Sequence, residues 1–186
     1  MKNVTRTICV LLLVANAVTA AFAIDQEKAN INKMRDQIHV LESVLNQTLT
    51  RNFPAPFAYL DTARGAYLPG YGVVFTFELN LSKPSMGPFD PPSTPQAERA
   101  KQDEAKRRRD LAKQMSEGVI ADFGHSLDQL GPNESLAIVI HGSSVGQQGI
   151  EQTTTVLRAQ KRDIDQFRAN TMDRAAFLRK VEVLEY

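Results

Sequence analysis

The spacing of apolar side chains changes between a helix period and a strand period along this chain, which limits the folds open to it. From Asp25 to Leu49, large apolar residues recur every three or four positions between charged or amide residues, as in an amphipathic helix. From Phe75 to Leu81, apolar and polar residues alternate, as in a half-buried strand. Separate segments with each period predict a domain that mixes helices with a sheet.

The N-terminal amphipathic segment, residues 24–51, has a narrow apolar seam. The seam consists of Ile31, Met34, Ile38, Leu41 and Leu45. It has two interpretations: a helix that packs on its own domain, or a short coiled coil with a second copy or a partner protein. Because the seam barely reaches the three or four heptads that coiled coils need, packing on its own domain is the favoured interpretation.

The middle of the chain has clear boundary signals. Pro54-Ala55-Pro56 ends the first helix, and Pro69-Gly70 predicts the turn of a β-hairpin. Residues 82–95 hold five prolines without periodicity and predict a loop. Thr94, followed by Pro95, predicts the N-cap of a long helix that ends near Leu130, before Gly131-Pro132.

The last third predicts two more strands and two short helices. The strands are expected over Ser135–His141 and Glu151–Ala159, with a glycine-rich turn between them. The helices are expected over Asp163–Ala169 and from Asp173 onward, while residues 181–186 fit either a helix end or a strand. The predicted fold is α+β: residues 52–186 form one domain whose small, mainly antiparallel sheet of about four strands is covered by the long helix.

The first 23 residues have the three parts of a secretory signal peptide. Lys2 and Arg6 form a basic region, Ile8–Val14 is apolar, and Ala21-Phe22-Ala23 has the small residues that signal peptidase requires. The apolar stretch is shorter than the roughly 20 residues that span a bilayer. We therefore expect cleavage before Ile24, with Val18-Thr19-Ala20 as a second possible cleavage site, and no stable membrane insertion afterwards.

The cysteine content and the charge balance limit the compartments and the classes of partner that fit this chain. Cys9 is the one cysteine of the chain and lies in the signal region, so the mature protein would have no disulfide. Small secreted eukaryotic domains usually depend on disulfides, so the sequence indicates export in a bacterium, to the periplasm or the exterior. With 22 basic and 21 acidic residues, the chain has no charge excess that would favour nucleic acid as a partner.

One motif suggests catalysis. Gly142-Ser143-Ser144-Val145-Gly146 matches G-x-S-x-G and follows an apolar run that ends in His141. A nucleophile elbow needs a helix directly after the serine and a histidine further along the chain. The residues after Ser144 predict a strand, and all three histidines precede it. A turn is therefore the favoured interpretation, and a small secreted serine hydrolase centred on Ser144 and His141 is the alternative.

The sequence offers few other candidates for a cofactor, metal or ligand site. No motif for a cofactor or a metal is present, and the histidines have only ordinary helix-surface carboxylates near them. The aromatic residues of the hairpin Tyr67–Phe77 suit either core packing or a ligand platform. The sequence predicts an exported, non-enzymatic envelope protein that serves as a protein-interaction or structural module.

Overall fold

A computed structural model of the chain describes residues 30–54, 59–82, 94–146 and 149–186. Its contacts divide the chain into two units, Met1–Asp36 and Gln37–Tyr186. Of the first unit, the structure describes only the helical residues 30–36. The sheet and all other helices belong to the second unit. The predicted signal peptide and most of the predicted proline-rich loop, residues 83–93, lie outside the described residues.

The second unit contains a five-stranded sheet with the strand order β1-β2-β3-β4-β5. The strands are β1 (Tyr59–Leu68), β2 (Gly72–Asn80), β3 (Ser135–Gly146), β4 (Gly149–Gln160) and β5 (Glu182–Glu185). Neighbouring strands are antiparallel except β2 and β3, which are parallel because α2 (Pro95–Phe123) connects them. The predicted α+β class is confirmed. The sheet has one strand more than expected, because the tail left open by the sequence forms β5.

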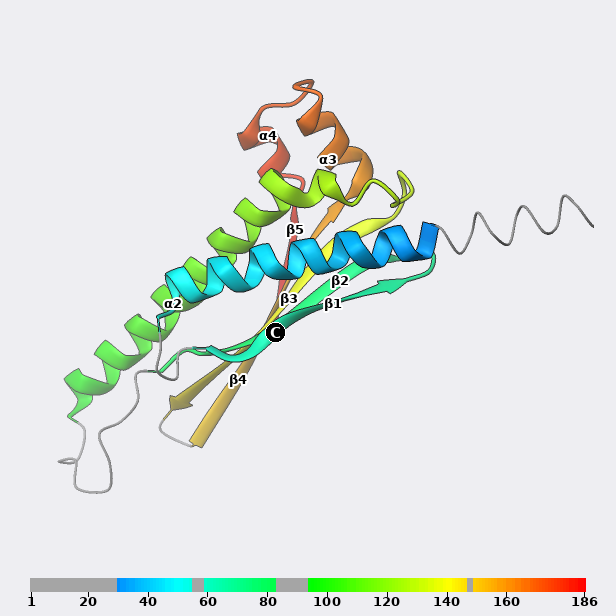
Figure 1. Cartoon of the computed structure of the whole chain (residues 1–186). Helices are drawn as coiled ribbons and strands as arrows, with labels where there is room; N and C mark the ends of the chain where they lie inside the picture. Colours follow the sequence, from blue (N-terminus) through cyan, green and yellow to red (C-terminus); the bar gives the residue numbers. More distant parts are fainter. Residues whose placement is uncertain (1–29, 55–58, 83–93, 147–148) are drawn as a thin grey trace, which may run out of the picture. The chain divides into compact units, whose positions relative to one another are not determined.

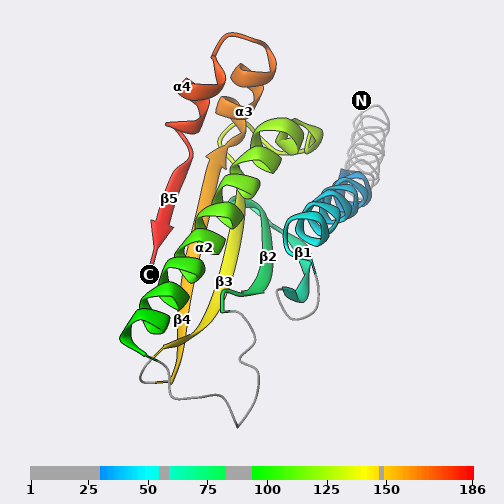
Figure 2. The same cartoon turned by 90° about the vertical axis from the view of Figure 1, so that its left-hand side faces the viewer.

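α2 and the part of the N-terminal helix that belongs to the second unit lie on one face of this sheet. The N-terminal helix, residues 30–52, packs through its part in the second unit on β1 and β2, and α2 runs along β3 and β4 (Figures 1 and 2). The core between these layers includes Phe75, Phe77, Leu79, Leu136, Ile138 and Leu157, each at most 2% exposed. Because side chains alternate along a strand, Thr76, Glu78 and His141 lie on the other face, where they are exposed.

The hairpin turn before β2 depends on glycine. Gly70 has a φ of +79°, which confirms the turn predicted from Pro69-Gly70. Gly72 has a φ of +126°, and a Cβ there would lie 1.9 Å from the carbonyl oxygen of Ser135. Glycine at this position therefore lets the parallel pairing of β2 with β3 begin.

α2 begins as predicted and ends earlier than predicted. The Thr94 hydroxyl accepts a hydrogen bond from the Ala97 amide at 3.2 Å, which caps the first turn. The helix stops at Phe123, not Leu130, and the 3₁₀ turn η1 (Gly124–Ser126) follows. A Cβ at Gly124 would lie only 3.1 Å from Leu136 and 3.2 Å from Ile164, so the chain passes close to the core here. Its change of direction buries Leu127 and Leu130.

Two short helices lead the chain back to the sheet edge. They are α3 (Lys161–Arg168) and α4 (Arg174–Leu178), so the first begins two residues earlier than predicted. Asn170 adopts a φ of 56° between them, and Asp173 caps α4 by accepting from the Ala176 amide at 2.7 Å. The rings of Phe167 and Phe177 stack with centroids 4.9 Å apart and hold the two helices together.

Candidate functional site

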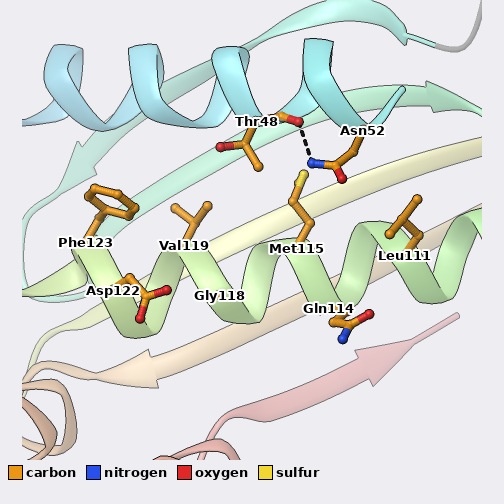
Figure 3. Close-up of a pocket in the computed structure, with 9 residues that line it drawn as sticks. All are labelled: Thr48, Asn52, Leu111, Gln114, Met115, Gly118, Val119, Asp122 and Phe123. Atoms are coloured by element: carbon orange, nitrogen blue, oxygen red, sulfur yellow. Dashed lines mark hydrogen bonds between the residues drawn. The ribbon is translucent and has the colours of Figure 1, made fainter. Parts of the chain in front are cut away.

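An apolar groove lies between the N-terminal helix and α2, within the second unit. Its volume is about 330 Å³ (Figure 3). The lining residues are Thr48 and Asn52 from the N-terminal helix and Leu111, Gln114, Met115, Gly118, Val119, Asp122 and Phe123 from α2. This volume is near the lower end of the range of about 300–1,000 Å³ seen for pockets that hold small ligands.

The α2 wall of the groove is a row of apolar side chains at four-residue spacing. Leu111, Met115, Val119 and Phe123 follow one another along the helix and point toward the groove (Figure 3). The two central residues of this row are buried, whereas Leu111 is 37% exposed and Phe123 is 43% exposed. Gly118 also lines the groove and contributes only backbone. α2 thus presents two accessible apolar anchors with a floor between them.

The hydrogen-bond donors on the opposite wall bond to backbone carbonyls of their own helix. The Thr48 hydroxyl donates to the Val44 carbonyl at 2.7 Å, and the Asn52 amide donates to the Thr48 carbonyl at 2.8 Å (Figure 3). Both side chains line the groove, and their donors are satisfied within the helix (Figure 3). This favours apolar contact over donation of a hydrogen bond to an occupant.

The charged residue of the groove also has a partner. Asp122 accepts a hydrogen bond from Arg174 of α4 at 2.7 Å, and this bond raises the pKa of Arg174 above its ordinary value. This contact turns the Asp122 carboxylate toward α4. The groove therefore has the chemistry of an apolar binding surface.

A second hollow, of about 310 Å³, lies at the end of the β3–β4 ribbon and includes His141. It is lined by Glu78, His141, Gly142, Ser143, Ile150, Gln152, Thr153 and Thr154. His141 Nδ1 lies 3.4 Å from the Thr154 hydroxyl, and the ring is exposed on the uncovered face of the sheet. His141 lies within β3, not at a strand end as the sequence suggested.

Ser144 is not beside this histidine. β3 continues through Ser144 to Gly146, so the predicted glycine-rich turn is mostly strand, and residues 147–148 lie outside the described part. Ser144 pairs with Glu151 of β4 in unbroken antiparallel register. Because side chains alternate along a strand, Ser144 and His141, three residues apart, project to opposite faces of the sheet. The strand after Ser144 is also not the helix that a nucleophile elbow needs.

The aromatic residues of the hairpin do not form one platform. Phe75 and Phe77 are buried in the core. The Tyr67 hydroxyl donates a hydrogen bond to the Glu134 carboxylate at 2.9 Å. The guanidinium of Arg158 lies over the ring of Tyr71, with its central carbon 5.4 Å from the ring centroid. The four rings therefore serve separate packing and hydrogen-bonding roles.

The predicted N-terminal seam is divided between the two units. Within the second unit, Ile38, Leu41 and Leu45 are at most 6% exposed, which supports packing on the domain itself. In the first unit, Ile31 is 57% exposed and Met34 is 5% exposed.

Metal binding and membrane crossing are two further possibilities for the described part of the chain. There, no group of three or more His, Cys, Asp or Glu residues is arranged to hold a metal ion. No helix among those residues has the length and apolar character needed to cross a membrane.

Comparison with known proteins gives no match, whether to a family model, to a curated protein or to a solved structure. The class that the fold and the groove define is an α+β domain with an apolar groove between two helices on its sheet.

Proposed function

We propose that this protein is an exported, non-enzymatic interaction module that binds an amphipathic helical segment of a partner protein in the groove. The observation that carries the proposal is the pair of half-exposed anchors, Leu111 and Phe123, with the buried floor of Met115 and Val119 between them. Helix-in-groove recognition uses such a surface, since the apolar face of one helix fills a hydrophobic groove on another protein.

The length of the groove supports a helical occupant. Leu111 and Phe123 are twelve residues apart on α2, which corresponds to about 18 Å along the axis. An occupant helix of about three turns would place side chains at spacings of three and four residues along this length. Small-ligand sites usually hold a few polar groups that orient the ligand. Here Thr48, Asn52 and Asp122 already direct polar atoms to other partners.

Export is part of the proposal and rests on the N-terminal sequence. The basic residues Lys2 and Arg6, the apolar run Ile8–Val14 and the Ala21-Phe22-Ala23 site together support a cleaved signal peptide. Intact-mass measurement on protein recovered from the exported fraction tests this part. We expect a chain that begins at Ile24, and a retained Met1 would contradict export by this route.

The groove is tested by site-specific photo-crosslinking in the host cell. A benzophenone amino acid at Gln114, an exposed position that lines the groove, is compared with one at Gln102, an exposed α2 position outside it. We expect a Gln114 adduct that mass spectrometry maps to an amphipathic helical segment of another protein. Replacing Leu111 with aspartate should abolish the adduct while the melting transition is retained.

Three outcomes would contradict helix binding in the groove. They are the absence of a Gln114 adduct, an equal yield of the same adduct from Gln102, and an adduct with a lipid or small molecule in place of a protein segment. The crosslinking result applies to the groove only if the substituted protein is folded. The melting curve of each substituted protein is therefore recorded before crosslinking.

A further inference from the structure

We propose that a second copy of this chain pairs with the outer edge of β5, so that two five-stranded sheets join across a two-fold axis. This contact is separate from the groove. β5 lies at the edge of the sheet beside β4 (Figure 2).

The backbone hydrogen bonds show which groups of β5 face outward. Tyr186 and Thr154 exchange two hydrogen bonds, at 2.7 Å and 3.0 Å. In an antiparallel ladder such hydrogen-bonded pairs recur at every second residue, so the backbone N–H and C=O groups of Leu184 and Glu182 also point toward β4. Val183 and Glu185 therefore direct their N–H and C=O groups away from β4. Within the described residues, nothing hydrogen bonds to these outward groups.

The side chains of this edge are exposed and largely apolar. Val183 is 37% exposed, Leu184 is 61% exposed and Tyr186 is 74% exposed. The two glutamates have cationic partners in the same chain: Glu182 lies 3.4 Å from Arg158, and Glu185 lies 3.7 Å from Lys113. These pairs reduce the repulsion that four glutamates would otherwise cause between two copies. Exposed apolar edges of this kind are templates for pairing with another strand.

The opposite edge of the sheet is closed by the N-terminal helix. The Asn46 carboxamide hydrogen bonds with both backbone groups of Ala63, and Glu42 accepts from the Gly65 amide at 2.7 Å. Head-to-tail pairing of β5 with β1 of another copy would need these groups. Pairing of β5 with β5 does not, and it gives a closed dimer because the same surface is used twice.

The sequence of β5 suits antiparallel pairing with itself about Leu184. In this register Val183 pairs with Glu185 of the second copy, and Glu182 lies opposite Tyr186 of the second copy. Leu184 faces its own counterpart, so no like charges lie directly opposite. A register centred on Glu185 would oppose two carboxylates. The contact of one short strand is smaller than the roughly 1,200–2,000 Å² of stable complexes, so we expect a weak dimer.

Sedimentation equilibrium of the full chain up to about 1 mM tests the dimer. Glu185→Pro removes an outward N–H and leaves the β4 ladder intact, which edge strands tolerate. The matched control Glu185→Gln loses the same charge but keeps the N–H. We expect wild type and Glu185→Gln to dimerise with the same dissociation constant, and Glu185→Pro to stay monomeric with an unchanged melting curve. A monomeric wild type, or a Glu185→Pro protein that dimerises like wild type, overturns the proposal.

A second measurement does not depend on the proline variant. In a Cys9→Ser background, Leu184→Cys places two thiols at a non-hydrogen-bonded pair, where Cα atoms are about 4.5 Å apart and a disulfide fits. The control is Leu68→Cys, since Leu68 is 47% exposed on β1 at the other edge. We expect a covalent dimer on mild oxidation of Leu184→Cys and not of Leu68→Cys. No crosslink at Leu184, or equal crosslinking at Leu68, refutes the pairing.

Discussion

The side-chain amide of Asn46 and the peptide group of Ala63 exchange two hydrogen bonds: Asn46 Nδ2 donates to the Ala63 carbonyl at 3.2 Å, and the Ala63 amide donates to Asn46 Oδ1 at 2.7 Å. This pairing imitates a neighbouring strand at the point where the β1–β2 register is irregular. A helix side chain thus satisfies backbone groups that the sheet leaves unpaired.

Asn46→Ala should therefore destabilise the domain. The substitution leaves two partly buried backbone groups without their partner, which costs about 1–3 kcal/mol. Asn52→Ala is the matched control, because the Asn52 amide donates only to Thr48 of its own helix and is exposed. We expect the control to change the free energy of unfolding by less than about 0.5 kcal/mol in urea titrations. Equal losses for both variants would contradict this role of Asn46.

The N-terminal helix offers a second matched pair. Leu41 is fully buried and the adjacent Val40 is 58% exposed. Leu41→Ala should lower the free energy of unfolding by about 2–5 kcal/mol through lost burial and the cavity it leaves. Val40→Ala should cost less than about 0.5 kcal/mol. If Leu41→Ala dissociates an oligomer and leaves the melting temperature unchanged, the seam is an intermolecular contact.

The pKa of Tyr67 gives a prediction about pH. The hydrogen bond to Glu134, with burial and the Glu134 charge, raises the pKa of Tyr67 above its ordinary value of 10.0. Because the folded state holds this proton more tightly, the associated stability is present below pH 10 and is lost as the pH rises through the folded pKa. In an absorbance titration of tyrosinate, the difference between wild type and Tyr67→Phe should have its midpoint above 10. Glu134→Gln should lower that midpoint, and a midpoint at or below 10 in the wild type would contradict the argument.

Ser144 gives a test of the hydrolase alternative. Its side chain projects to the face of the sheet opposite His141, so a fluorophosphonate should not label it. Ser144→Ala should leave the melting temperature within a few degrees of wild type, because Ser144 is only half-buried. Stoichiometric labelling of the wild type that disappears in Ser144→Ala would restore the catalytic interpretation.

Local patterns predicted the elements well where one side-chain period or one cap dominates. Thr94, Asp173 and the Pro69-Gly70 turn act through bonds within a few residues, so their sequence signals need no tertiary information. The end of α2 at Phe123 depends on the close approach of Gly124 to Leu136 and Ile164, which are distant in the sequence. The short β5 likewise forms because β4 is available to pair with it.

The sequence did not predict the groove, because the apolar spacing on α2 indicated only a face that packs on the core. Leu111, Met115, Val119 and Phe123 are spaced by four residues, and each such step advances roughly 40° beyond a full turn of a 3.6-residue helix. The series therefore winds around α2. Its centre faces the core, and its ends emerge at 37% and 43% exposure. The four-residue spacing can be read from the sequence. Whether another element covers Leu111 and Phe123 depends on the tertiary fold.

Two glycines near the helices should respond in opposite ways to replacement by alanine. At Gly65 a Cβ would lie 2.5 Å from the Phe75 ring and 2.7 Å from Ile38, both in the core, so Gly65→Ala should cost about 1–3 kcal/mol by overpacking. At Gly118, inside α2, the nearest atom would be 3.9 Å away, so Gly118→Ala should add about 0.5–1 kcal/mol through helix propensity. Urea unfolding measures both changes. A stability loss in Gly118→Ala comparable to that in Gly65→Ala would contradict this argument, because the Gly118 methyl has room beside Arg174 of α4 whereas the Gly65 methyl has none beside Phe75.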